Sequence, residues 1–382
     1  MERVIKGIHY KTKQPVEITL DNGLIAEIES NPTLKSEKTI APGLVDLQIN
    51  GFRGVDFNEE ELQESDVVKI TEYLWQEGVT SYYPTLITNS DCAVCTALET
   101  IVSACEKDIY INKTISGIHL EGPFLSLEDG PRGAHPLKYV KAPDWNLFCK
   151  WQKLAKGKIK MITLSPEWPE AIAFIKQCVA SGVIAAIGHT AASSEQIKEA
   201  VLAGARVSTH LGNASHATLP RHANYIWEQL AAEDLWATII ADGFHLPKSV
   251  LSVFVKVKGE KCVLVSDATR FAGLPSGSYS SHIGGEIELN DDGKLFIKDN
   301  PNMLAGSAQS LCWCVDHLVN SEIATLSTAL DMASIKVQQL LGEKGAMGLE
   351  KNAIADVIVF ERTNNKINIL KTIKAGKVVY TR

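Results

Sequence analysis

The chain has 382 residues, of which 45% are hydrophobic and 22% are charged, and its formal net charge is −7. This mildly acidic balance argues against proteins that bind nucleic acid or an anionic membrane surface, because both kinds of partner need a basic face. No stretch approaches the roughly 18 consecutive apolar residues of a membrane span, and the first residues lack the apolar core of a signal peptide.

The two ends of the chain predict a small β domain. Residues 16–20 and 24–29 alternate apolar and polar side chains around Asp21-Asn22-Gly23, which is a hairpin signal. Residues 356–361 and 372–380 show the same alternation, with a turn at Ala375-Gly376-Lys377. We therefore expect residues 1–42 and 349–382 to pair into a small β-sandwich beside a larger domain of residues 43–348.

The larger segment alternates eight β-rich runs with stretches of helical periodicity, such as 62–76, 91–106 and 193–202. Eight repeats of strand and helix predict a closed parallel (β/α)8 barrel of the TIM type, an α/β fold. A β-ribbon at 283–298, with a turn at Asp291-Asp292-Gly293, is predicted as an insertion after the eighth strand. The eight runs are 44–50, 80–86, 116–122, 159–167, 184–190, 205–213, 237–245 and 261–269.

Reactive polar side chains lie toward the C-terminal ends of five of these runs. In a parallel barrel all such ends open on one face, so residues far apart in sequence converge there. The sequence therefore predicts a functional site on that rim. The residues are Glu121, His189, His210, His245 and Asp267.

Three of these residues suit one divalent metal ion. Glu121, His189 and His210 offer a carboxylate and two imidazoles and leave a coordination position open, which is typical of catalytic zinc; iron and cobalt accept the same ligands. The alternative, that each histidine only satisfies a hydrogen bond in the core, is disfavoured by three matching strand ends. Asp267 is placed to accept the proton of a metal-activated water, the alternative being a structural salt bridge.

Several motifs carry a resemblance to known enzymes. Residues 41–46 (APGLVD) resemble the first-strand signature of the amidohydrolase superfamily. The strings at 117–124 (GIHLEGPF), 187–190 (IGHT), 209–214 (THLGNA) and 241–245 (ADGFH), together with Ser266-Asp267-Ala268, resemble the N-acetylglucosamine-6-phosphate deacetylase family. The resemblance implies hydrolysis of the acetamide of a phosphorylated amino sugar, with release of acetate and the free amine.

The resemblance also implies roles for single residues. Glu121, His189 and His210 become the metal ligands, Asp267 the acid/base and His135 a group that polarises the acetyl carbonyl. The remaining residues are expected to bind the substrate, with Arg221 and His245 reaching its phosphate from a neighbouring subunit, so that a homodimer is implied. These substrate-binding residues are Asn213, Ala214, Arg221, His245 and Gln48.

Two departures from the family pattern refine the prediction. Gln48 and Asn50 replace the His-x-His of many amidohydrolases, and neutral amides are poor zinc ligands, so a single metal is predicted. After Arg221 the chain reads His222-Ala223-Asn224, where the family commonly has Glu-Pro-Gly. An amidohydrolase that deacylates another N-acyl sugar or amine therefore stays open as an alternative, as does a non-catalytic barrel that binds a sugar phosphate.

The eight cysteines are scattered along the chain and do not form a disulfide framework. Scattered cysteines in a chain of this size are typical of a reducing compartment. Together with the composition, they predict a cytoplasmic enzyme that acts on a small molecule.

Overall fold

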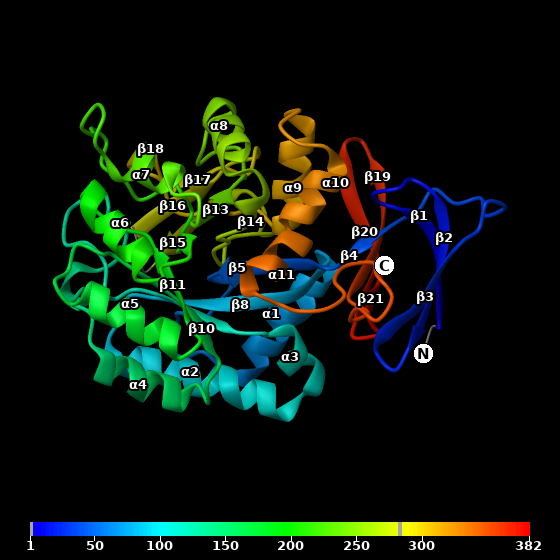
Figure 1. Cartoon of the computed structure of the whole chain (residues 1–382), viewed down its shortest axis with the longest axis horizontal. Helices are drawn as coiled ribbons and strands as arrows, with labels where there is room; N and C mark the ends of the chain where they lie inside the picture. Colours follow the sequence, from blue (N-terminus) through cyan, green and yellow to red (C-terminus); the bar gives the residue numbers. More distant parts are fainter. Residues whose placement is uncertain (1–2, 282–284) are drawn as a thin grey trace.

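The computed structural model of this chain describes residues 3–281 and 285–382. Eight parallel strands form one sheet in the order β14-β13-β12-β11-β10-β9-β8-β5, and a bridge between Ile49 and Ala268 nearly closes its two edges into a barrel. The predicted (β/α)8 architecture is confirmed (Figure 1). The barrel strands are β5 (Leu44–Ile49), β8 (Val79–Ile87), β9 (Ile118–Glu121), β10 (Ile159–Leu164), β11 (Ile184–Ile187), β12 (Val207–Ser208), β13 (Trp236–Ile240) and β14 (Cys262–Val265).

Helices cover the outside of the barrel (Figure 1). The helices predicted at 62–76, 91–106 and 193–202 are present as α1, α2 and α6. The Ser193 hydroxyl accepts a hydrogen bond from the Gln196 N–H, and the Gln196 side-chain oxygen accepts one from the Ser193 N–H; this capping box starts α6. The helices are α1 (Glu64–Gln76), α2 (Asp91–Lys107), α3 (Ile109–Thr114), α4 (Trp145–Leu154), α5 (Ala171–Ala180), α6 (Ser194–Leu202), α7 (Tyr225–Ala231), α8 (Lys248–Lys258), α9 (Leu311–Asn320), α10 (Leu326–Met332) and α11 (Ile335–Leu341), with 3-10 turns at Leu137–Tyr139 and Gly259–Lys261.

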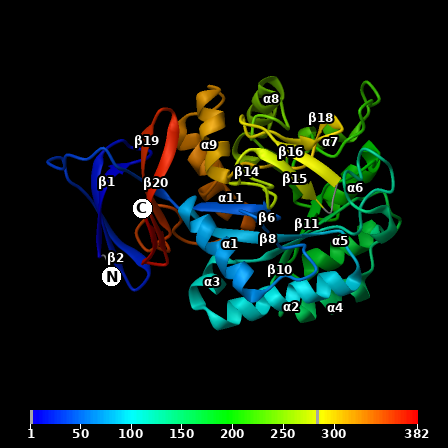
Figure 2. The same ribbon diagram turned by 180° about the vertical axis from the view of Figure 1, so that it is seen from behind.

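The chain ends form a second sheet of seven strands, ordered β21-β20-β19-β4-β1-β2-β3. The predicted turns are present: Asn22 and Gly23, and likewise Ala375 and Gly376, have the positive φ angles of tight hairpins. The first and last strands of the described chain lie in this sheet, at one end of the molecule (Figures 1 and 2). We propose that it forms the small domain of residues 1–42 and 349–382. Its strands are β1 (Val4–His9), β2 (Pro15–Asp21), β3 (Leu24–Ser30), β4 (Thr39–Pro42), β19 (Val357–Thr363), β20 (Lys366–Lys374) and β21 (Lys377–Thr381).

A four-stranded antiparallel sheet lies over the barrel near α7, away from the seven-stranded sheet (Figure 2). Its middle strands are the predicted ribbon, with Gly293 at positive φ in the turn between them; positions 283 and 284 of that prediction lie outside the described residues. The sequence did not predict the outer strands. The sheet contains β15 (Gly277–Ser281), β16 (Gly285–Leu289), β17 (Leu295–Ile297) and β18 (Asn300–Leu304), and a small ribbon of β6 (Gly51–Phe52) and β7 (Val55–Asp56) precedes α1.

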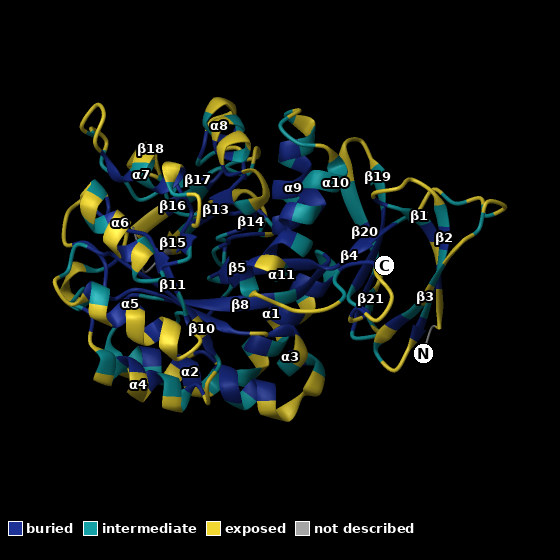
Figure 3. Cartoon of the chain, in the orientation of Figure 1, coloured by how far each residue is buried: buried dark blue, intermediate teal, exposed yellow. Residues whose placement is uncertain are grey.

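The barrel strands carry the core. All six residues of β5 and all four of β9 are buried, as expected for parallel strands covered on both faces (Figure 3). The eight cysteines carry free thiols. Within the described ranges, no helix combines the length and apolar character that crossing a membrane requires.

Candidate active site

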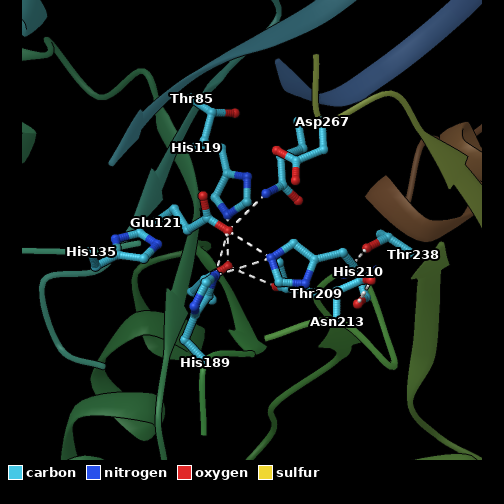
Figure 4. Close-up of polar contacts among 12 residues, drawn as sticks. Thr85, His119, Glu121, His135, His189, Thr209, His210, Asn213, Thr238 and Asp267 are labelled. Carbon is cyan, nitrogen blue, oxygen red and sulfur yellow. Dashed lines mark hydrogen bonds and ion pairs between the residues drawn. The ribbon is translucent and has the colours of Figure 1, made fainter. Parts of the chain in front are cut away.

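Glu121, His189 and His210 meet at the C-terminal rim of the barrel (Figure 4). The Glu121 Oε1 atom lies 2.9 Å from His210 Nε2 and 3.1 Å from His189 Nε2, and the two Nε2 atoms are 3.1 Å apart. All three side chains are buried. The structure thus brings together the three residues that the sequence predicted as metal ligands.

The strands that deliver these residues are shorter than predicted. Glu121 is the last residue of β9, but His189 and His210 lie two residues beyond β11 and β12, and Asp267 lies two residues beyond β14. These three residues have φ angles of 51°, 31° and 47°, which side chains other than glycine rarely adopt. The left-handed backbone ends each strand, and such strain is concentrated at functional sites.

The donor set fits a divalent metal ion. His189 Nδ1 lies 3.0 Å from the Pro131 carbonyl oxygen and donates its proton there, so Nε2 is the nitrogen that faces the cluster. Burial raises the pKa of Glu121, but its hydrogen bonds to His189 and His210 outweigh burial and hold that pKa well below its usual range. A carboxylate and two imidazole nitrogens about 3 Å apart can all contact one ion at roughly 2.0–2.2 Å.

Asp267 faces the cluster from β14. Its Oδ1 accepts a hydrogen bond of 2.8 Å from the Asn50 amide. Burial, with a further contribution from Glu121, raises the pKa of Asp267 to about 7. A carboxyl group in this range can both take up and release a proton near neutral pH, which is the chemistry predicted for it.

His135 comes from the loop after β9 and packs edge-on against His189, with ring centroids 4.3 Å apart. Its Nδ1 lies 2.9 Å from the Thr88 hydroxyl oxygen. Burial, followed by the proximity of His189, lowers the pKa of His135 to about 3. The ring is therefore neutral and bears a single proton.

One cavity of about 310 Å³ connects these groups. Its polar wall includes the metal cluster, Asp267 and His135. Asn213 and Ala214 also line it, and β17 and β18 supply apolar residues. The residues that line it further include Asn50, Asp56, Asn58, His245, Phe271, Ile297, Met303 and Leu304.

Comparison with known proteins agrees with this geometry. Residues 39–379 match the amidohydrolase family. The chain is 31% identical over 350 residues to N-acetylglucosamine-6-phosphate deacetylase from Bos taurus, covering 89% of this chain and 83% of the bovine protein. It is 26% identical over 349 residues to N-acetylgalactosamine-6-phosphate deacetylase from Escherichia coli O157:H7, covering 90% of each chain.

A solved structure agrees as well. It is an aspartate-to-alanine variant of N-acetyl-D-glucosamine-6-phosphate deacetylase from Mycobacterium smegmatis, in complex with N-acetyl-D-glucosamine-6-phosphate. It has a TM-score of 0.84 and 25% identity, with 96% of this chain and 95% of that one covered. The chain belongs to the amidohydrolase family. The comparisons also confirm the predicted resemblance to the N-acetylglucosamine-6-phosphate deacetylases.

Buried polar side chains lie next to the metal-type cluster of this amidohydrolase. Gln48 Nε2 donates a hydrogen bond of 2.8 Å to Glu121 Oε1. His119, two residues before Glu121, lies 2.7 Å from the Thr163 hydroxyl and 3.2 Å from the Leu47 carbonyl oxygen. Gln48 is 1% exposed and is not among the described residues that line the cavity. Its contact is with a ligand residue, and substrate binding by Gln48 stays a prediction.

His245 lines the cavity of its own chain, which favours a contact within the subunit; its implied approach to the substrate of a neighbouring subunit stays a prediction. His245 Nδ1 lies 2.7 Å from Asp242 Oδ2, and Asp242 lies two residues beyond β13. Burial raises the pKa of Asp242, but the bond to His245 outweighs burial and lowers it. Asp242 was not singled out from the sequence, although its position relative to β13 matches that of Asp267 relative to β14.

Arg221 is the predicted site residue that lies apart from the others. It is exposed, on the loop before α7, and is not among the described residues that line the cavity. This placement leaves Arg221 free to reach another molecule, so its predicted contact with the substrate of a neighbouring subunit remains open.

Proposed function

We propose that this amidohydrolase hydrolyses the acetamide of N-acetylglucosamine-6-phosphate to glucosamine-6-phosphate and acetate. The observation that carries the proposal is the arrangement at the barrel rim, where three metal-type ligands, Asp267 and His135 surround one cavity. The bovine relative, at 31% identity, bears the name of this activity. A binding protein without catalysis would not need a buried carboxyl group of raised pKa beside such a cluster.

The proposed cofactor is one divalent metal ion, zinc or, with the same ligands, iron or cobalt. When bound, it supplies a Lewis acid that polarises an amide carbonyl and lowers the pKa of a water molecule. Glu121, His189 and His210 would hold it. Gln48 and Asn50, at the positions of the missing His-x-His, instead donate hydrogen bonds to Glu121 and Asp267, which supports a single ion.

The residues of this chain divide the chemistry between them. Asp267 takes a proton from the attacking water and later gives it to the departing amine nitrogen. His135, neutral and facing the cavity, donates a hydrogen bond to the carbonyl oxygen as negative charge develops there. Asn50 holds the Oδ1 atom of Asp267 and so fixes the orientation of its carboxyl group.

We propose that Asn213, Ala214 and His245 bind the phosphate from within the subunit, and that Arg221 reaches it from the partner in a homodimer. Asn213, Ala214 and His245 line the cavity, and Arg221 is exposed. Trp227, in α7 shortly after this loop, is 53% exposed, which suits a subunit contact near the loop. Sedimentation should give twice the chain mass; a monomer with full activity would contradict the contribution of the partner.

The free thiols of all eight cysteines support a further proposal, a cytoplasmic location, because reduced cysteines are typical of that compartment. Fractionation of cells that express the protein tests this. Recovery in the cytoplasmic fraction is expected, and recovery in an extracytoplasmic fraction would contradict it.

Acetate release tests the proposed reaction. Protein of known metal content should release acetate from N-acetylglucosamine-6-phosphate much faster than from unphosphorylated N-acetylglucosamine. Absence of release with metal present would refute the proposed substrate while leaving the barrel and the ligand cluster in place.

A second substrate, N-acetylgalactosamine-6-phosphate, is favoured by one observation. The relative from Escherichia coli O157:H7 is named N-acetylgalactosamine-6-phosphate deacetylase, and this chain aligns with 90% of its length. The two sugars differ only in the configuration of one hydroxyl group. Acetate release from N-acetylgalactosamine-6-phosphate is measured in the same assay. A higher kcat/KM for this sugar than for N-acetylglucosamine-6-phosphate would make it the preferred substrate.

A further inference from the structure

Thr88 lies beside the reaction site without lining the cavity. It follows β8 directly, is 2% exposed, and its Oγ1 lies 2.9 Å from His135 Nδ1 and 3.4 Å from the backbone carbonyl oxygen of Glu121. One hydroxyl group therefore lies between the imidazole expected to face the substrate and the backbone of a metal-type ligand.

Gly122 makes room for this hydroxyl group. A Cβ atom at Gly122 would lie 2.2 Å from Thr88 Oγ1, and Gly122 has a φ of +89°. Both the conformation and the space therefore require glycine here. The close approach places the Thr88 oxygen where it meets the His135 ring edge.

The hydroxyl group has one proton and can donate it to one acceptor at a time. The 2.9 Å contact to His135 Nδ1 is a normal hydrogen bond, whereas 3.4 Å to the carbonyl oxygen of Glu121 is long. When Thr88 donates to Nδ1, that nitrogen offers its lone pair, so the proton of the ring must be on Nε2. In the reverse arrangement Nδ1 carries the proton, and Nε2 offers a lone pair that cannot donate to a carbonyl oxygen.

Nε2 is the nitrogen available to a ligand. His135 lines the cavity, and within the described residues no hydrogen-bond partner meets its Nε2 atom. The tautomer of His135 therefore determines whether the cavity presents a donor or an acceptor at this point.

We infer that Thr88 is a positioning residue that donates its hydroxyl proton to His135 Nδ1 and thereby keeps the ring in the Nε2–H tautomer, the form that donates to the substrate carbonyl. The inference rests on the proposed function for the role of the carbonyl, but the tautomer itself can be measured without any substrate.

The kinetic test compares three side chains at position 88. Thr88→Val keeps the shape and removes the hydroxyl group, and it should lower kcat on the order of tenfold with little change in KM, because the lost donor acts mainly on the developing oxyanion. Thr88→Ser keeps the hydroxyl group and should retain most of the turnover. Thr100→Val, at a half-buried position of α2, is the matched control and should behave as wild type. Metal content and the thermal unfolding midpoint are measured for each variant.

A double-mutant cycle separates positioning from a structural role. If Thr88 acts through His135, Thr88→Val should cause no further loss in a His135→Gln background. An equal loss in both backgrounds, or a Thr88→Ser variant as impaired as Thr88→Val, would overturn the inference. Thr88→Ala takes the place of the valine variant should the latter not fold.

Nitrogen NMR of metal-free protein with 15N-labelled histidine gives the direct readout. His135, assigned by the signal lost in His135→Gln, should show a protonated Nε2 and an unprotonated Nδ1, and Thr88→Val should convert it to a mixture of tautomers. A protonated Nδ1 in the wild type would refute the inference. If the wild type released no acetate but showed the Nε2–H tautomer, the proposed function would fail while the assignment to Thr88 would stand.

Discussion

The metal-type cluster and the loop of residues 213–224 lie on the same rim of the barrel but are held in different ways. Glu121, His189 and His210 are buried and each bonds to its neighbours in the cluster. In the loop, residues 221–223 are exposed. If the proposed function holds, we expect that the barrel fixes the bond-breaking groups, while the more exposed loop selects which sugar phosphate reaches them.

The largest expected effect lies in the buried region. Asp267→Asn should lower kcat on the order of 10³-fold, because general acid–base groups contribute roughly 10²–10⁴. Metal content should stay unchanged, since Asp267 is outside the ligand cluster. Asp234→Asn, a remote and exposed carboxylate, is the control. Near-normal turnover by Asp267→Asn, measured by acetate release, would contradict its role and weaken the comparison.

A second prediction concerns the buried floor of the barrel. Asp46 Oδ1 accepts bonds from the backbone N–H groups of Gln48 and Ser266, and among the described residues its buried Oδ2 has no partner. Burial raises the pKa of Asp46 from 3.8 to about 6. The folded state thus holds the proton more tightly than the unfolded state. The protonated Asp46 contributes fully to the free energy of unfolding below pH 3.8, and this contribution is lost as the pH rises through about 6.

This loss amounts to ~3 kcal/mol in the free energy of unfolding. Asp46→Asn should not show it, so the difference in unfolding free energy between variant and wild type should grow in favour of the variant from about pH 4 to 7. Urea unfolding at several pH values measures that difference. Parallel pH profiles for the two proteins would show that Asp46 does not titrate in this range.

The loop should behave differently from the buried region. Arg221→Ala should raise KM for the phosphorylated sugar roughly tenfold, the loss of one charge-assisted contact, and leave kcat and the unphosphorylated sugar almost unaffected. Arg382→Ala, at the far end of the molecule in the small sheet, is the matched control. An effect on kcat alone, or on both sugars equally, would place Arg221 outside phosphate recognition.

The smallest expected effect is on the free energy of unfolding and comes from the N-terminus of α6. Ser193→Ala removes the hydroxyl group that caps α6 and should lower the free energy of unfolding by about 1 kcal/mol, with kcat and KM unchanged. Chemical denaturation measures the stability change. A change in turnover would mean that the stability of α6 is coupled to the site at the barrel rim.

The sequence predicted the parts of this molecule that repeat. Eight apolar runs separated by helical periodicity defined the barrel, and Glu121, His189 and His210 could be located because each lies near the C-terminal end of such a run. Periodicity could not show where the strands stop. Left-handed backbone at His189 and His210 ends β11 and β12 earlier than their apolar runs suggest.

Contacts between elements could not be predicted in the same way. Thr88, Asn50 and Asp242 make hydrogen bonds with His135, Asp267 and His245, respectively. Neither composition nor spacing shows which side chains a fold brings together. The reach of Arg221 is harder still to predict, because residues 221–223 are exposed and the expected partner of Arg221 belongs to another subunit.

The central claim is that one metal ion, held by Glu121, His189 and His210, is needed to hydrolyse the acetamide of N-acetylglucosamine-6-phosphate. Titration of metal-free protein with zinc, followed by acetate release, tests it most directly. We predict that activity is absent without metal, rises linearly and saturates at one equivalent per chain. Activity in metal-free protein, or saturation only at two equivalents, would contradict the claim.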